Sequence, residues 1–343
     1  TGTSPVIQAE QGLVTGPLPL TPIQQWFFAE NLPEPHHWNQ AFLFQVRQAI
    51  DTQLLEKAIQ HLLAHHDALR LRFAQSDSGW QQAMGSMSEA IPLSRLDLST
   101  LDDAEQGEAI LSTATELQAS LSLSEGPLTR FALFELGPQK PNRLLVIIHH
   151  LAVDGVSWRI LMEHLDLLYR QLENKDAIEL PPKTTSYRHW AERLTEHAQT
   201  EELQRELPFW LSVQEAEISP LPVDYPQGMN SNTEATADSI STSLDVENTQ
   251  LLLKEVPKAY QTQINDVLLA ALAQAVIQWT GTSTLLVDLE GHGREAILED
   301  ADLSRTVGWF TSIFPVSVSL EKDSDWGELL KSTKEQLRHI PNR

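Results

Sequence analysis

The chain has 343 residues, 41% of them hydrophobic, and its 24 basic and 47 acidic side chains give a formal net charge of −23. This acidic balance repels phosphate backbones and anionic membranes, and no apolar run approaches the roughly 18 residues of a membrane span, so neither nucleic acid nor a membrane is an expected partner. The absence of cysteine excludes disulfides, thiolate metal sites and cysteine nucleophiles, and it suits a cytoplasmic protein.

The first part of the chain predicts a lobe of mixed helices and strands. Thr21 and Pro22 predict the start of a helix in "PLTPIQQWFFAENLP", and Asp51 predicts the cap of a second helix, "DTQLLEKAIQHLLAHHDAL". The segments "WNQAFLFQV", "LRLRF", "LTRFALFEL" and "RLLVIIHH" have strand character. Further helices are expected over about residues 101–120 and 156–173. This mixture is typical of an α/β fold.

A second lobe is expected after a hinge over residues 174–186, because the length suits two lobes of roughly 150 residues each. We place a polar arm at 1–18, an N-terminal lobe at 19–178 and a C-terminal lobe at 179–343. The second lobe is predicted to contain helices near 187–198 and 201–213, a strand at 238–244, a helix at 263–280, the strands "TLLVDLE" and "SIFPVSVSL", and a helix from about 325.

Adjacent histidines occur in three places, so their pairing is not diagnostic by itself: His36-His37, His65-His66 and His149-His150. The second pair ends a predicted helix, where imidazole suits the helix dipole. The third pair ends a buried strand before Asp154 and Gly155, and Gly155 is expected to allow a tight bend into the next helix. Neighbouring residues on a strand point to opposite faces, so one imidazole of this pair can face a cleft and act as a base near neutral pH.

The residues give less support to a metal site, a serine nucleophile or a dinucleotide-binding site. His-His-x-x-x-Asp could contribute metal ligands, but no cysteine and no second triplet of suitable spacing completes a site. "GVSWR" lacks the second glycine of a serine nucleophile elbow. Gly291, Gly293 and Ala296 fit G-x-G-x-x-A after a strand, although the acidic stretch "ILEDADLSRTVG" is not a crossover helix. Alternatively, Glu290 projects a carboxylate into a cleft, with Arg294 near enough to pair with an acid.

Taken together, the motifs resemble the condensation superfamily of nonribosomal peptide synthetases, which is related to chloramphenicol acetyltransferase. "HHLAVDGVSWR" is similar to its His-His-x-x-x-Asp-Gly signature. "LTPIQQWFFAENLPEPHHWNQ", "HHDALRLRF", "NDVLLAALAQAV", "EGHGRE" and "RTVGWFTSIFPV" resemble the motifs of its epimerization branch, in their usual order. "AEQGLVTG" resembles the linker that joins an upstream carrier domain to such a domain, which identifies residues 1–18 as that linker.

The resemblance implies an α/β fold, an α+β sandwich of two chloramphenicol acetyltransferase-like lobes in a V with a tunnel between them. Family members continue beyond "LRHIPNR", so the second lobe is expected to be incomplete here. The implied substrate is an aminoacyl or peptidyl thioester on the 4'-phosphopantetheine arm of a carrier protein. That arm is delivered by the carrier, and no covalently bound cofactor is expected in this chain. The implied partners are the upstream carrier domain, in cis, and adjacent synthetase modules.

The implied reaction is inversion of the Cα from L to D by a base and an acid, and the resemblance assigns these roles to His150 and Glu290. His150 is expected to face the tunnel while His149 packs away from it. Asp154 is expected to be structural, paired with Arg294 or Arg70. Other residues are expected to support or line the site: Gly155, through backbone N–H groups at the helix start, His292 and Trp309. A peptide-bond-forming condensation domain and a non-catalytic carrier-docking module are the alternatives.

Overall fold

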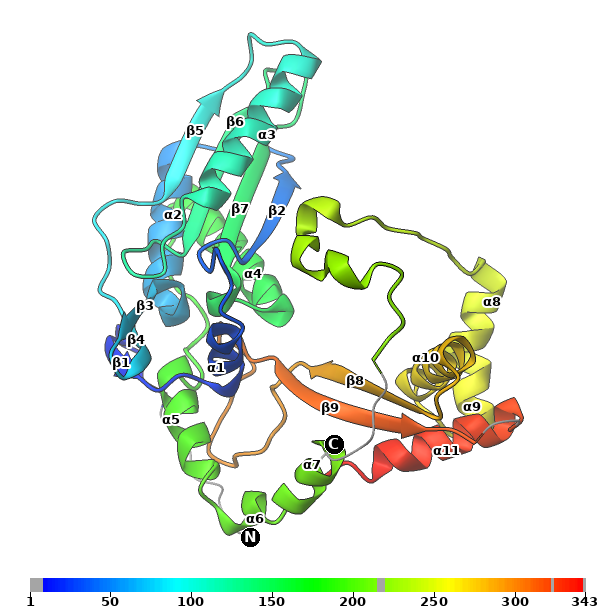
Figure 1. Ribbon diagram of the computed structural model, residues 1–343. Helices are drawn as coiled ribbons and strands as arrows, with labels where there is room; N and C mark the ends of the chain where they lie inside the picture. Colours follow the sequence, from blue (N-terminus) through cyan, green and yellow to red (C-terminus); the bar gives the residue numbers. More distant parts are fainter. Residues whose placement is uncertain (1–8, 215–219, 322–323, 342–343) are drawn as a thin grey trace. The chain divides into compact units, whose positions relative to one another are not determined.

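The computed structural model describes residues 9–214, 220–321 and 324–341 (Figure 1). Its contacts divide the chain into two compact units. The first unit comprises Thr1–Thr200 and Gly291–Ser312, and the second comprises Glu201–Glu290 and Ile313–Arg343. A segment from late in the sequence therefore returns to the first unit. The lobe boundary at residue 178 stays a prediction, but the contacts group residues 179–200 with the first unit.

The first unit is built on a four-stranded sheet in the order β2-β7-β6-β5. The strands are β2 (Asn39–Gln45), β5 (Leu93–Asp97), β6 (Thr129–Glu135) and β7 (Arg143–His149). Only the β5–β6 pair is parallel among these neighbours. One face packs Ala132, Phe134 and Ile147 against helix α3 (Asp103–Ala119). The buried side chains that alternate with these along β6 and β7 point to the opposite face of the sheet. Helices α2 (Thr52–His65) and α4 (Gly155–Asn174) cover that face in Figure 1.

A smaller sheet in the order β1-β4-β3 stands beside the first. It consists of β1 (Gly16–Leu18), β3 (Leu71–Ser76) and β4 (Gly79–Met84), all antiparallel. Helix α1 (Pro22–Ala29) follows β1, and its Gln24 side chain accepts a hydrogen bond from the Thr21 backbone N–H at 3.0 Å. The described end of the expected linker is thus part of the fold, because Val14 is buried and residues 16–18 pair with β4.

Two 3₁₀ turns and one more helix complete the regular structure of the first unit. They are η1 (Asp67–Arg70), η2 (His150–Ala152) and α5 (Tyr187–His197). The returning segment 291–312 contains no helix. It is held by hydrogen bonds to the residues just before α5, including Thr185 N–H to the Asp302 carbonyl at 2.9 Å and Thr306 Oγ1 to the Thr185 carbonyl at 2.6 Å.

The second unit is a two-stranded sheet, β8 (Thr284–Gly291) and β9 (Ser312–Ser319), with helices against it. Its core joins Ala273, Val318 and Leu337, one each from α10 (Ile264–Thr280), β9 and α11 (Trp326–Arg338). The remaining elements are short: α6 (Glu201–Gln204), α7 (Leu207–Gln214), η3 (Pro226–Ser231), η4 (Glu234–Thr236), α8 (Val246–Gln250), the π-helix η5 (Leu251–Glu255) and α9 (Val256–Tyr260).

Two predicted elements of this unit are wrong. The helix expected over 201–213 is two helices, α6 and α7, because Pro208 has no N–H to give to a preceding turn. The strand expected at 238–244 is absent: these residues are exposed, with Ile240 fully so, and no described strand pairs with them. An extended segment forms a β-strand only when a neighbouring strand supplies the hydrogen-bond partners.

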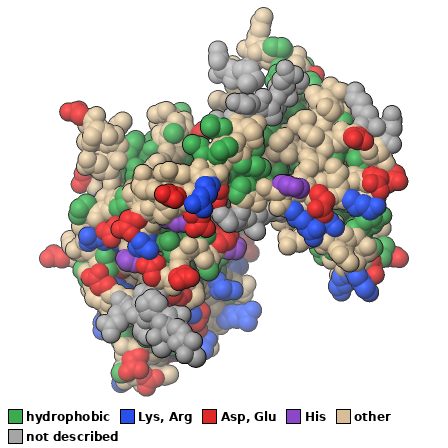
Figure 2. Space-filling view, turned by 90° about the horizontal axis from the view of Figure 1, so that it is seen from below, with side chains coloured by type: hydrophobic (Ala, Val, Ile, Leu, Met, Phe, Trp, Pro, Cys, Tyr) green, Lys and Arg blue, Asp and Glu red, His purple; other side chains and the backbone are tan. Residues whose placement is uncertain are grey.

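None of the helices within the described ranges is both long and apolar enough to cross a membrane. Figure 2 shows acidic side chains spread over the face that it presents, with basic side chains among them.

Candidate functional site

His149 ends β7 with its imidazole fully enclosed. Its Nε2–H donates to the Pro35 carbonyl at 2.8 Å, and its Nδ1 accepts from the Leu151 backbone N–H at 3.2 Å. The ring of Phe27 stands edge-on against it at 5.9 Å. Burial lowers the pKa of His149 to about 4, so the ring is neutral. Both nitrogens are engaged, and this histidine is therefore part of the scaffold.

His150 begins η2 and is only partly buried. Its Nδ1 lies 2.8 Å from the Val153 carbonyl, and its Nε2 lies 3.0 Å from the side-chain nitrogen of Gln40 on β2. The ring of Trp309 covers it, with centroids 4.4 Å apart. Trp309 is itself buried, and its indole N–H has no hydrogen-bond partner within the described part of the chain. The structure thus gives the two adjacent histidines different surroundings.

Asp154 caps α4 and anchors the returning segment. Its Oδ1 accepts from the Ser157 backbone N–H at 2.7 Å, and its carboxylate pairs with the Arg294 guanidinium at 3.0 Å. The Phe310 backbone N–H also donates to this carboxylate, at 3.3 Å. Both side chains of the ion pair are less than a tenth exposed. Of the two arginines that the sequence left open, Arg294 is the partner, while Arg70 pairs with Asp67.

Arg294 also donates to three other acceptors, while its buried Nε has no hydrogen-bond partner among the described residues. It donates to the carbonyls of Leu303 and Thr306, each at 2.8 Å, and to the Ser157 hydroxyl at 3.0 Å. Its guanidinium carbon lies 4.0 Å from the centre of the Phe310 ring. Ser157 also bonds both backbone groups of Gly308. The sequence reasoning missed Ser157, Gly308 and Gln40 as site residues, because hydrogen bonds between distant segments leave no spacing signal.

Gly293 has a steric reason for being glycine. Its φ is +65°, and a Cβ there would lie 1.6 Å from the Phe310 carbonyl oxygen. No helix follows it, so the dinucleotide-binding interpretation of Gly291, Gly293 and Ala296 is wrong. Dinucleotide binding needs a helix N-terminus directly after the glycines. Here Gly293 instead allows its backbone to pass close to the backbone of Phe310.

Three of the expected site residues are exposed to solvent. Gly155 is the first residue of α4, but its φ is not positive and a Cβ would meet nothing within 4 Å, so the entry into α4 does not require a glycine there. His292 is exposed and lies 3.3 Å from the Glu295 carboxylate. Glu290 is exposed on β8, and its carboxylate forms no hydrogen bond or ion pair with any described residue. It belongs to the second unit, and His150 belongs to the first.

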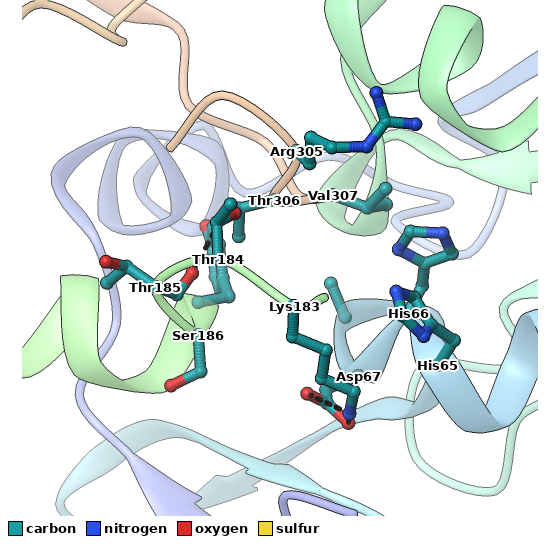
Figure 3. A pocket seen from close by; sticks show the side chains of 12 residues that line it. His65, His66, Asp67, Lys183, Thr184, Thr185, Ser186, Arg305, Thr306 and Val307 are labelled. Carbon is teal, nitrogen blue, oxygen red and sulfur yellow. Dashed lines mark hydrogen bonds and ion pairs between the residues drawn. The ribbon is translucent and has the colours of Figure 1, made fainter. Parts of the chain in front are cut away.

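The pair at the end of α2 meets a third histidine from α4. The rings of His65, His66 and His164 offer nitrogens within 4.8 Å of one another, a spacing that a metal ion could bridge. However, Arg305 donates to His164 Nε2 at 2.6 Å, so His164 in turn donates from Nδ1 to His66 Nε2 at 2.9 Å. His65, His66, Lys183 and Arg305 are among the residues that line a cavity of about 30 Å³. Their side chains are drawn in Figure 3. Both nitrogens of His164 and Nε2 of His66 are engaged, and two cations lie nearby, so this arrangement disfavours a bound metal ion.

The buried histidines predict a stability that is lost in acid. Burial lowers the pKa of His65, His149 and His164 from 6.5 to about 4, and that of His66 well below its usual value. As the pH falls, these histidines therefore bind protons in the unfolded chain before they do so in the folded chain. The free energy of unfolding should fall as the pH drops from 6.5 towards 4. For His149 alone the full loss is roughly 3 kcal/mol.

Urea denaturation followed by tryptophan fluorescence across this pH range measures the effect. A free energy of unfolding that stays level between these pH values would contradict the expectation.

Comparison with known proteins identifies relatives of the whole chain. The family model for the condensation domain matches residues 14–343. One of the linear gramicidin synthase proteins of Brevibacillus parabrevis is 52% identical over 336 residues, which are 97% of this chain and 4% of that protein. Tyrocidine synthase 2 of the same organism is 40% identical over 345 residues, with 98% of this chain and 9% of that protein covered. The chain thus spans a small fraction of these relatives.

Solved structures share the fold. The epimerization domain from the third module of tyrocidine synthetase B matches with a TM-score of 0.84 and 40% identity, covering 97% of this chain and 73% of that one. The first condensation domain of the calcium-dependent antibiotic synthetase matches with a TM-score of 0.70 and 19% identity, covering 94% and 73%. The α/β fold is therefore that of condensation and epimerization domains, as the sequence predicted.

Proposed function

Because the chain belongs to the condensation domain family, we propose that it inverts the Cα of an aminoacyl or peptidyl thioester, from L to D, on the phosphopantetheine arm of a carrier protein. The observation that carries this proposal is the likeness to an epimerization domain, at 40% identity against 19% for the condensation domain of the calcium-dependent antibiotic synthetase. The carrier domain, upstream in cis, and adjacent synthetase modules are the proposed partners.

The substrate itself makes the chemistry accessible. A thioester carbonyl conjugates weakly with sulfur, so it accepts the charge of a neighbouring carbanion as an enolate. One group removes the α-hydrogen, with the electrons of the Cα–H bond moving into the enolate, and a second group returns a proton to the opposite face. The two groups exchange their protonation states in each turnover.

His150 and Glu290 are the proposed pair, with roles that reverse with direction. His150 is only partly buried and its Nε2 meets the side-chain amide of Gln40, whereas both nitrogens of His149 are engaged by the backbone. Glu290 carries a carboxylate that is not committed to any described residue. The Asp154–Arg294 pair is proposed to hold the segment around the base without touching substrate. The N-terminal N–H groups of α4 at Gly155 are proposed donors to the enolate oxygen, and His292 and Trp309 are proposed to line the site.

The test is hydrogen exchange in deuterated water. The full chain is incubated with an L-aminoacyl or peptidyl thioester on a carrier protein, and the released product is scored for deuterium at Cα and for D configuration. We expect exchange with D product, reduced at least about a hundredfold by His150→Ala and by Glu290→Gln, because each removes one proton-transfer group.

Asp288→Asn is the matched control for Glu290. Asp288 is also exposed and lies two residues earlier on β8, on the same face of the strand, so this change removes a nearby carboxylate and should leave exchange intact. A dipeptidyl thioester formed with an added amine would indicate a condensation domain instead. Carrier binding without any change of substrate, with or without His150, would indicate a docking module.

A further inference from the structure

The hydrogen bonds at His150 determine where its protons lie. Its Nδ1 is 2.8 Å from the Val153 carbonyl oxygen, which can only accept. Nδ1 therefore carries a proton whether the ring is neutral or charged. Whether His150 is a base or a cation is decided at the other nitrogen, Nε2, and so by the group that Nε2 meets.

That group is the side-chain amide of Gln40, which lies 3.0 Å from Nε2. An amide has an accepting oxygen and a donating nitrogen, and a third residue fixes which end faces the histidine. The indole Nε1 of Trp158, a donor only, is 2.6 Å from Gln40 Oε1. The oxygen is thus held by Trp158, and the NH₂ group is directed at His150 Nε2.

Packing keeps the three side chains in this order. Gln40 lies on β2, whose backbone pairs with β7 so that Gln40 stands opposite Ile148. Trp158 is 6% exposed in α4, and its ring stands edge-on to Phe42, two residues along the same face of β2, with centroids 4.7 Å apart. Trp309 covers the His150 ring.

We propose that Gln40, oriented by Trp158, is a positioning residue that holds His150 in its neutral form with the lone pair on Nε2. If the amide were turned over, its oxygen would face Nε2 and the ring would need a second proton, which would convert the base into a cation. The α-hydrogen of the substrate takes the place of the amide hydrogen in front of Nε2. This role rests on the proposed epimerization, in which His150 is a base.

The other titratable groups near the His150 ring do not determine whether Nε2 carries a proton. His149 in β7 is buried and bonded to the Pro35 carbonyl. His36 and His37, from the loop before β2, interact electrostatically with His149, and His36 accepts a bond from the Leu123 N–H at 3.0 Å. The carboxylate of Asp154 is paired with Arg294. The contact to Nε2 is made by Gln40 alone among the residues that the structure describes.

Ring-¹⁵N histidine spectra of the full chain test the inference without substrate, with the His150 signals assigned by their loss in His150→Ala. In the wild type we expect the neutral ring to carry its proton on Nδ1. Gln40→Glu places an oxygen opposite Nε2, so both nitrogens should be protonated, and the titration of His150 should move to higher pH by about one unit or more. Trp158→Phe frees the amide to turn and should move the titration in the same direction by less.

The matched control is Gln45→Glu, which adds the same charge on an exposed residue of β2 about 16 Å further along the strand and should leave the titration in place. The pH dependence of deuterium exchange should shift with the titration in each variant. A wild-type proton on Nε2, or a His150 titration that is the same in Gln40→Glu, Trp158→Phe and the wild type, overturns the inference. If the spectra behave as expected but the wild type exchanges no deuterium, the proposed function fails and the positioning of His150 stands.

Discussion

Asp154→Ala is expected to destabilise the first unit by about 3–5 kcal/mol, because it leaves the Arg294 guanidinium buried without its counter-charge. The same change removes the cap of α4 at Ser157 and the acceptor of the Phe310 N–H. Asp154→Asn should cost less, since an amide oxygen can still cap the helix. The segment 291–312 should become more open to proteases in both variants, because its anchor is weakened.

Denaturant unfolding measures the loss, and Asp166→Ala is the control. Asp166 lies on the same helix and also pairs with an arginine, Arg170 at 3.0 Å, but both side chains are mostly exposed. That pair should contribute only a few tenths of a kcal/mol. If Asp154→Ala and Asp166→Ala were equally stable, the buried ion pair would not be an anchor of the fold.

Gly293→Ala is expected to cost about 3 kcal/mol or more. The left-handed backbone at φ +65° contributes roughly 1–2 kcal/mol of this for any residue with a Cβ. The larger part comes from the methyl group itself, which would lie 1.6 Å from the oxygen and 2.6 Å from the carbon of the Phe310 carbonyl. These are backbone atoms, so the segment must shift as a whole, and the packing of Phe310 against Arg294 should be lost with it.

Two further glycines separate the two costs. Gly79→Ala introduces only the backbone strain, since its φ is +105° and nothing lies within 4 Å of the added carbon. Gly155→Ala introduces neither, because its φ is not positive and the space is open. The free energies of unfolding should therefore rank Gly155→Ala as most stable, Gly79→Ala next and Gly293→Ala last. Equal values for Gly79→Ala and Gly293→Ala would show that the backbone accommodates the added methyl group.

Much of the fold could be read from local sequence patterns. Helix α2 begins after Asp51, which accepts from two backbone N–H groups of its first turn, and α10 and α11 form where apolar residues recur at helical spacing. The buried runs of β6 and β7 predicted strands for the same reason. Strands β4 and β5 were missed because "GWQQAM" and "LSRLD" are polar, and their pairing with β3 and β6 supplies what their composition lacks.

By itself the sequence determined the family and the residues worth testing, because ordered motifs such as "HHLAVDGVSWR" and "EGHGRE" depend only on residue type and spacing. Tertiary structure decided which arginine pairs with Asp154 and which side chain faces His150. Those outcomes depend on segments more than a hundred residues apart in the chain, such as Gln40 with Trp158 or Asp154 with Arg294. Contacts of that kind arise only when β2, α4 and the returning segment are packed together, so no local pattern carries them.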